Sequence, residues 1–299
     1  MISDSPQISV IEPAPPETHA VRKWLWPSVV LAAVLVYLYA NILHRLVGEW
    51  WSNPNFSHGF FVPPFAAFLI WKNRDRLKTV TVRPSLAGLA VIAFGLMLLV
   101  VGVLGAELFL SRTSFLFVLA GLLVYFKGWK YFRVLFFPWL FLFLMVPPPT
   151  LIMNHITIPL QFVASDLATW LLRVSGVPVL QNGNVIQLPN MALDVVEACS
   201  GIRSLISLGV MAIIYGYLLE SSNVLRALLA FAAIPIAVIA NGLRIMGTGL
   251  TGLYWEPSKA QGFFHEFSGW VIFVVALATL YLFHHVMRAV AHLLRRSTA

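Results

Sequence analysis

Three short segments of the sequence carry side chains that can perform acyl-transfer chemistry. The first is Glu197-Ala198-Cys199-Ser200-Gly201, which holds the single cysteine of the chain. Cys199 follows a predicted β segment and opens a predicted helix, whose N-terminus lowers the pKa of a thiol by stabilising the thiolate. Glu197 has the opposite effect, because a nearby carboxylate disfavours the thiolate. The structural alternative is a buried cysteine, since cysteine is among the residue types most often found in cores.

Two later segments carry the partners that such a thiol needs. Asn241-Gly242-Leu243-Arg244 offers a guanidinium, whose fixed donors can stabilise an oxyanion or bind a carboxylate, with Asn241 on the same helix face. His265-Glu266-Phe267-Ser268-Gly269 offers an imidazole, which can activate the thiol and later protonate a leaving amine. The structural alternatives are an arginine that snorkels to the membrane interface and a histidine that caps a helix.

Two further side chains compete for these roles. Arg203 follows Cys199 by four residues on one helix face, so it could replace Arg244 as the oxyanion donor. His58 stands at the outer edge of the second predicted span and could replace His265 as the base. We predict that both support the site or contact the substrate. The histidines near the C-terminus are expected at the cytoplasmic surface: His284, His285 and His292.

The elements that hold these residues must cross a lipid bilayer. Of the 299 residues, 59% are hydrophobic and 11% are charged, whereas soluble domains have roughly 25% charged residues. The net charge of +8 does not indicate nucleic acid as a partner, because most basic residues lie in short loops between apolar runs. One cysteine excludes an internal disulfide and a cysteine-based zinc site, and we expect neither a metal nor another cofactor. We expect membrane lipid to surround most of the protein's apolar surface.

Apolar runs of suitable length predict an all-α polytopic membrane protein with about eight transmembrane helices. The runs cover residues 25–46, 59–71, 86–106, 113–126, 134–146, 202–219, 224–240 and 267–287. The basic loops place both termini in the cytoplasm, so that Cys199, Arg244 and His265 all fall at the outer level. We expect a disordered cytoplasmic tail over 1–24, a membrane domain over 25–288 and a basic cytoplasmic tail over 289–299.

Two segments depart from the transmembrane pattern. Residues 156–174 carry a polar stripe at four-residue spacing, which favours an amphipathic helix that lies in the interface or packs its stripe against protein. The stripe consists of Gln161, Ser165, Thr169 and Arg173. Residues 178–188 predict a β-hairpin on a type I′ turn at Asn182-Gly183, and 191–196 can add a third strand. Open strand edges would leave amides unpaired in hydrocarbon, so this hairpin is expected outside the bilayer.

In their order and spacing, the three reactive segments resemble the signature blocks of the exosortase/archaeosortase family. Ser57-His58-Gly59-Phe60 with the prolines that follow resembles that family's N-terminal half. The resemblance implies a bacterial inner-membrane cysteine protease or transpeptidase whose active site faces the periplasm. It implies that Cys199 is the nucleophile, His265 the acid and base, and Arg244 the group that stabilises the oxyanion or acyl-enzyme.

The substrates that the resemblance implies are exported proteins ending in a Pro-Glu-Pro-like motif, a transmembrane helix and a basic tail. It leaves open the oligomeric state and whether water or an amine resolves the acyl-enzyme. Two other functions stay open at this point. One is a non-enzymatic subunit for polysaccharide export or assembly. The other is a membrane acyltransferase, which would use histidine with a carboxylate and tolerate the loss of Cys199.

Overall fold

The computed structural model describes residues 18–195, 201–254 and 263–297. By their internal contacts, residues 1–45 and 46–299 form two compact units. The first unit holds most of α1 (Thr18–Ser52), whose stretch from Val29 onward is long and apolar enough to cross a membrane. The divisions expected over 1–24, 25–288 and 289–299 stay predictions, and part of the first lies outside the described residues.

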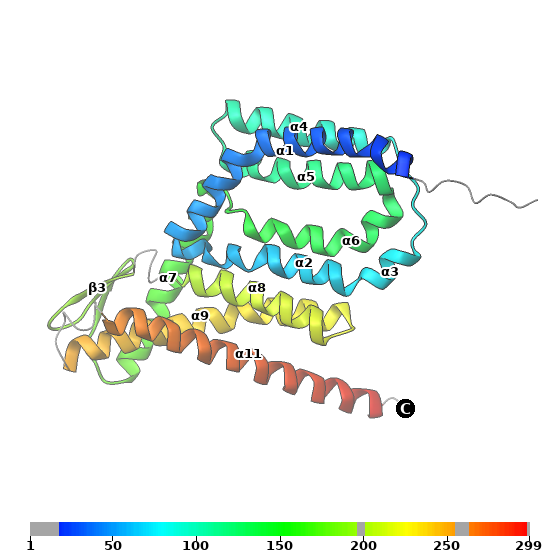
Figure 1. The fold of residues 1–299 in the computed structure, drawn as a ribbon. Coiled ribbons are helices and arrows are strands. Elements are labelled where there is room, and N and C mark those ends of the chain that lie inside the picture. The colour runs from blue at the N-terminus through cyan, green and yellow to red at the C-terminus, as the bar shows by residue number, and fades with distance from the viewer. Residues whose placement is uncertain (1–17, 196–200, 255–262, 298–299) are drawn as a thin grey trace, which may run out of the picture. The chain divides into compact units, whose positions relative to one another are not determined.

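The second unit is built mainly from helices. In chain order these are η1 (Pro54–Phe60), α2 (Val62–Lys72), α3 (Arg74–Thr79), α4 (Ala87–Leu104), α5 (Leu108–Lys127), α6 (Trp129–Phe141), η2 (Leu142–Met145), α7 (Thr150–Val174), α8 (Ile202–Leu219), α9 (Asn223–Tyr254) and α11 (Phe263–Ser297), where η marks a 3₁₀ helix. Figure 1 shows α4, α5, α6 and α2 stacked in that order, and α8, α9 and α11 running side by side.

The all-α polytopic fold class is confirmed. Within the described residues, six helices are long and apolar enough to cross a membrane: α1, α4, α5, α8, α9 and α11. A bent pair, in which 129–145 and 150–174 meet at 76°, can supply a seventh span. The runs expected at 59–71 and 134–146 form the shorter helices α2 and α6, of 11 and 13 residues. Both are shorter than the roughly 20 helical residues of a perpendicular crossing.

Glycines hold α4 and α5 together. Gly88, Gly95 and Gly102 recur at every seventh position of α4 and are buried. A Cβ atom at Gly88 would lie 2.4 Å from the backbone nitrogen of Tyr125, and one at Gly102 would lie 2.6 Å from that of Ser111. The two helices therefore touch backbone to backbone, which is the close contact that small residues permit in membrane helices.

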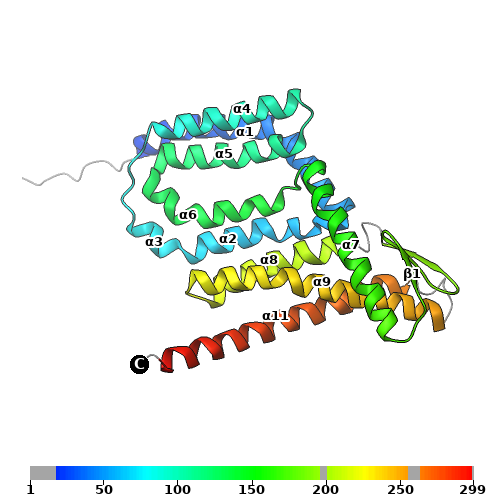
Figure 2. The same cartoon turned by 180° about the vertical axis from the view of Figure 1, so that it is seen from behind.

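Helix α7 runs across the direction of α8 and α9, as Figure 2 shows, and it turns the predicted polar stripe toward protein. Ser165 and Thr169 are 0% and 2% exposed, Gln161 is half-buried, and Arg173 at the end of the stripe is exposed. The Ser165 hydroxyl donates to the carbonyl of Gln161. Helix α9 and strands β1 and β2, described next, pack against α7. The expected amphipathic helix is thus present, and the polar side chains in the middle of its stripe are buried.

The predicted hairpin and third strand form an antiparallel sheet in the order β1 (Leu180–Asn182), β2 (Val185–Gln187), β3 (Ala192–Asp194). Asn182 pairs with Val185, so the loop residues are Gly183 and Asn184, one position later than predicted. Only Gly183 of the two has a positive φ, +63°, which fits a type II′ turn with glycine first rather than type I′. Ile186 and Leu193 face a core shared with α7 and α9.

One expectation about histidines is wrong. His284 in α11 is 2% exposed, whereas His285 beside it is exposed. The Nε2 atom of His284 donates to Glu220 Oε1 at 2.6 Å, and its Nδ1 lies 2.7 Å from the Tyr215 hydroxyl. His284 therefore ties α11 to the end of α8, and its position near the basic tail did not predict this burial.

Candidate active site

The described chain resumes at Gly201, immediately after the segment that carries the proposed nucleophile. Cys199 and Glu197 themselves lie outside the described residues. Gly201 stands at the N-cap of α8 with φ +80° and ψ 3°, a left-handed conformation that only glycine adopts without strain. The cysteine segment therefore leads directly into the N-terminus of a helix, as the sequence predicted, and that end of a helix favours negative charge.

Gly201 lies directly against the side chain of Asn241. A Cβ atom at Gly201 would stand 2.7 Å from Asn241 Cγ and 2.9 Å from Asn241 Nδ2, which is too close for atoms that are not covalently bonded. Asn241 is 1% exposed on α9. The segment containing Cys199 and the segment containing Arg244 are therefore in contact through these two residues, which are forty positions apart in the sequence.

The third segment reaches the same place from α11. A Cβ atom at Gly269 would lie 3.4 Å from both Cζ and Nη2 of Arg244, which is ordinary van der Waals contact. The guanidinium of Arg244 thus rests on the backbone of α11 at a position without a side chain. His265 lies one helical turn before Gly269, in the first turn of α11, and its side chain is outside the described set. The structure therefore brings together described residues of all three predicted segments, namely Gly201, Asn241, Arg244 and Gly269.

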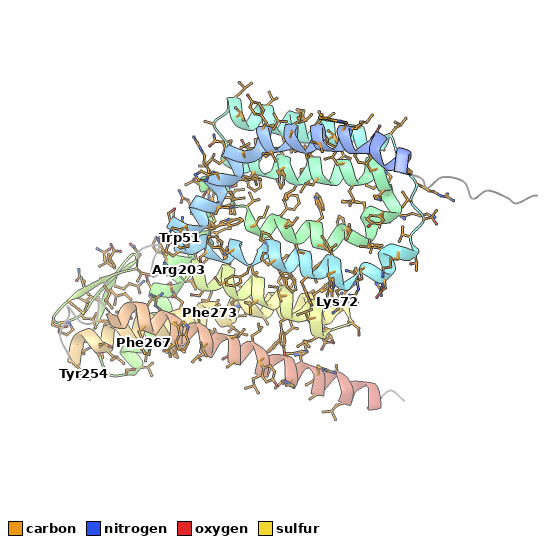
Figure 3. The ribbon with its side chains drawn as sticks, in the orientation of Figure 1. Trp51, Lys72, Arg203, Tyr254, Phe267 and Phe273 are labelled. Atoms are coloured by element: carbon orange, nitrogen blue, oxygen red, sulfur yellow. The ribbon has the colours of Figure 1, made fainter. Side chains whose placement is uncertain are left out.

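Arg203 and His58 lie on elements that pack together. Arg203, labelled in Figure 3, is exposed at the second residue of α8. Helix η1, which carries His58, packs against α8. His58 is 8% exposed, and its Nε2 lies 3.0 Å from the carbonyl of Leu144 in η2. Because a carbonyl only accepts, Nε2 carries the proton. Burial lowers the pKa of His58 below its ordinary value, which favours this neutral form.

A hydrogen bond from Trp50, near the end of α1, reaches the same short helix η2 as the one from His58. The indole Nε1 of Trp50 donates to the carbonyl of Met145 at 2.9 Å, next to the carbonyl that His58 contacts. Gly59 allows this packing, since a Cβ atom there would lie 2.4 Å from the same indole nitrogen. Trp50 lies near the end of α1, so its ring connects that end to η2, whereas His58 connects η1 to η2. Helix η1 is thereby held where it packs against α8.

An apolar groove of about 550 Å³ opens between α7, α8 and α9. Leu205 and Gly209 line it from α8, Ile234 and Val238 from α9, and Pro159 from α7. Leu205 is one turn from Gly201, so the groove begins beside the end of α8 that carries the cysteine segment. This groove was not predicted from the sequence. The sequence feature that could have indicated the groove is Gly209, because glycine has no side chain and the space beside it is open.

Across the residues that the structure describes, no three histidine, aspartate, glutamate or cysteine side chains gather as a metal site. The described site offers a helix N-terminus, an amide side chain and a guanidinium. These groups stabilise negative charge on an oxygen or a sulfur atom.

Comparison with known proteins gives one match. The family model for transmembrane exosortases matches residues 50–282, a range that holds all three segments as well as His58 and Arg203. No curated protein and no solved structure matches the chain.

Proposed function

Because this chain belongs to the transmembrane exosortase family, we propose that it is a membrane cysteine peptidase or transpeptidase. Its substrates are exported proteins that end in a sorting signal: a short Pro-Glu-Pro-like motif, a transmembrane helix and a basic tail. The enzyme resides in the bacterial inner membrane, with the active site at the periplasmic face. The observation that carries the proposal is the contact of Gly201 with Asn241 and of Gly269 with Arg244, which join the three segments.

The reaction begins at the thiol of Cys199. His265 takes the thiol proton, and the thiolate sulfur attacks the carbonyl carbon of the scissile peptide bond. The carbonyl oxygen becomes an oxyanion, which the N–H donors of Arg244 stabilise. The C–N bond then breaks, His265 returns its proton to the leaving amine, and a thioester remains on Cys199. Water or an acceptor amine attacks the thioester and releases the thiol.

Asn241 and Arg203 have supporting roles in this scheme. Asn241 fills the space beside Gly201 and sets the distance between α8 and α9 at the level of the site. Arg203 is exposed at the start of α8, where its charge can meet an acidic group of the substrate motif. His58 holds η1 against η2 through the Leu144 carbonyl, and Glu197 raises the pKa of the thiol.

The groove between α7, α8 and α9 suits the membrane-embedded part of such a substrate. It is lined almost entirely by apolar side chains and begins one turn from Gly201, so an apolar helix in it would present its outer end to the site. Gly209→Leu would fill the groove and should lower processing. Gly48→Leu is the matched control, because Gly48 also faces open space but lies outside the groove.

Processing of a tail-bearing reporter in cells tests the proposal. Cys199→Ser should leave uncut reporter at normal enzyme abundance, with a loss on the order of a thousandfold or more. Arg244→Lys keeps the charge but loses the planar fork, so processing should fall by roughly a hundredfold. His265→Ala should accumulate little acyl-enzyme, because both proton transfers need the base.

Arg203→Lys is the matched control for Arg244→Lys and should reduce processing much less. Normal processing by Cys199→Ser at normal abundance would refute covalent catalysis. A non-enzymatic role in polysaccharide export would then be the better explanation.

A further inference from the structure

The strand that leads toward the cysteine segment has one open edge. β3 pairs with β2 in the register Val185 with Asp194, Ile186 with Leu193 and Gln187 with Ala192. Among the described elements, no helix or strand other than β2 packs along the length of β3. Figure 1 and Figure 2 show the sheet at one end of the helices, beside the ends of α9 and α11.

The hydrogen bonds next to this register fix which backbone groups point outward. The N–H of Leu188 donates to the carbonyl of Met191, and the N–H of Val195 donates to that of Asn184. In an antiparallel ladder such bonded pairs alternate with non-bonded pairs. Ile186 and Leu193 are therefore the bonded pair between them. It follows that the N–H and C=O groups of Ala192 and Asp194 point away from β2, along the open edge.

Core packing and a side-chain hydrogen bond fix the position of β3. Leu193 and Val195 are 9% and 1% exposed in the core that the sheet shares with α7 and α9. The side chain of Asn184 donates to the carboxylate of Asp194 at 2.9 Å, which fixes the end of the strand. The side chains of Ala192 and Asp194 are exposed on the other face. Within the described residues, the outward N–H and C=O groups of Ala192 and Asp194 have no partner, and such a strand edge is a template for another strand.

The position of β3 in the chain suggests which peptide pairs with its open edge. Asp194 is five residues before Cys199, so the chain between them spans at most about 18 Å. A peptide lying along β3 therefore stays within this reach of the nucleophile. Backbone pairing also supplies affinity without selecting side chains.

We propose that the outer edge of β3 binds the extended segment of the substrate next to the cleaved bond, as an added strand. The inference rests on the proposed function, since it takes a peptide as the substrate. Ala192 and Asp194 contribute backbone donors and acceptors, and the edge of β1 on the other side of the sheet does not take part. The ligand class is a peptide in β conformation, with tolerance for its side chains.

Disulfide trapping tests the pairing directly. The Cys199→Ala variant contains no cysteine and, under the proposed function, does not cut the substrate. Ala192→Cys and Asp194→Cys are each combined with single cysteines scanned through the substrate segment. The two enzyme positions should crosslink most strongly to substrate residues two positions apart, and the sign of that offset gives the strand direction. Leu180→Cys on β1, 72% exposed, is the control and should crosslink weakly. Uniform crosslinking, or equal crosslinking at Leu180→Cys, would overturn the proposal.

A proline pair provides a second, functional test in the enzyme with Cys199 intact. Ala192→Pro removes an outward N–H without breaking the ladder with β2 and should reduce processing by roughly three- to tenfold, the size of one net hydrogen bond. By the same alternation, Gln181 has its backbone on the outer edge of β1, so Gln181→Pro should leave processing near normal. If Cys199→Ser abolishes processing while Ala192→Pro behaves as wild type, the strand inference fails and the proposed function stands.

Discussion

The guanidinium of Arg112 meets the carboxylate of Glu49, with 2.6 Å between Nη2 and Oε2. Arg112 is 3% exposed although it lies near the start of α5, and Glu49 is in the last turns of α1. A buried charge whose partner is removed loses its compensation and destabilises the folded state strongly. This ion pair therefore joins α5 to the end of α1, just before η1 in the sequence.

Glu49→Gln should lower the free energy of unfolding by about 3 kcal/mol or more, because it leaves the Arg112 charge buried without a counter-charge. The matched control is Asp75→Asn, which removes an exposed ion pair of 3.2 Å with Lys78 and should cost less than about 1 kcal/mol. Thermal unfolding of the purified proteins in detergent compares the two. Equal effects of both substitutions would contradict the structural role of the buried pair.

Gly201→Ala should abolish processing, because the new methyl group collides with Asn241 and the backbone of residue 201 is left-handed. Gly176→Ala separates these two causes. Gly176 has φ +82° but open space around it, so its alanine variant bears only the backbone strain, about 1 kcal/mol. Reporter processing and abundance are measured for both. Equal loss in the two variants would show that strain, and not the contact with Asn241, is what matters.

The buried imidazole of His58 predicts a dependence of stability on pH. Burial lowers its folded-state pKa below the ordinary 6.5, so the unfolded chain binds the proton more readily than the folded chain does. Stability is therefore full above about pH 7 and falls as the pH drops through 6.5 toward the folded pKa. His58→Gln keeps a donor for the Leu144 carbonyl and should flatten this slope. Unfolding midpoints between about pH 5 and 8 check it, with exposed His155→Gln as a control that keeps the wild-type slope.

The network of Tyr215, His284 and Glu220 should stabilise the contact between α8 and α11. Tyr215→Phe removes the hydroxyl that meets His284 Nδ1 at 2.7 Å and should cost about 1 kcal/mol. Tyr281→Phe, in the same region but 55% exposed, should change the unfolding midpoint little. A larger shift for Tyr281→Phe than for Tyr215→Phe would contradict the hydrogen-bond assignment.

Orientation in the membrane is testable by labelling. The positions expected outside are Asn182 in β1 and Lys259, the latter beyond the described residues. Asn182→Cys in a Cys199→Ala background should react with an impermeant thiol reagent added outside the inner membrane. Arg76→Cys in α3, also exposed, should react only after the membrane is opened. Labelling of Asn182→Cys from the cytoplasmic side alone would reverse the predicted topology.

A helix or strand could be predicted from the sequence where the pattern of side chains within that segment determines its structure. Apolar length predicted the long helices, and the buried Ser165 and Thr169 follow from their four-residue spacing. The turn shifted by one residue, because Gly183 accepts either register and the pairing of Ile186 and Leu193 with the core decided it. Patterns within one segment therefore predict structure more reliably than features that depend on packing between segments.

Contacts between distant segments could not be predicted in this way. An arginine inside an apolar run, as at Arg112, must find a partner, but the sequence offers both Glu49 and Glu107 as candidates. Likewise, nothing in the segment containing Gly201 indicates that its glycine faces Asn241. His284 has the same residue type as exposed His285, and only the direction of its side chain on α11 separates them.

The glycines of α4 also limit which mutations the gene can carry. Any single-base change that replaces a glycine adds at least one side chain carbon, and at Gly88 and Gly102 that carbon meets backbone atoms of the neighbouring helix, which cannot rotate away. The exposed apolar residues between them, such as Leu89 and Val100, can exchange for other apolar residues at little cost. Natural variation along this helix should therefore be confined to the faces between fixed positions, a constraint that comes from interhelical distance and is independent of catalysis.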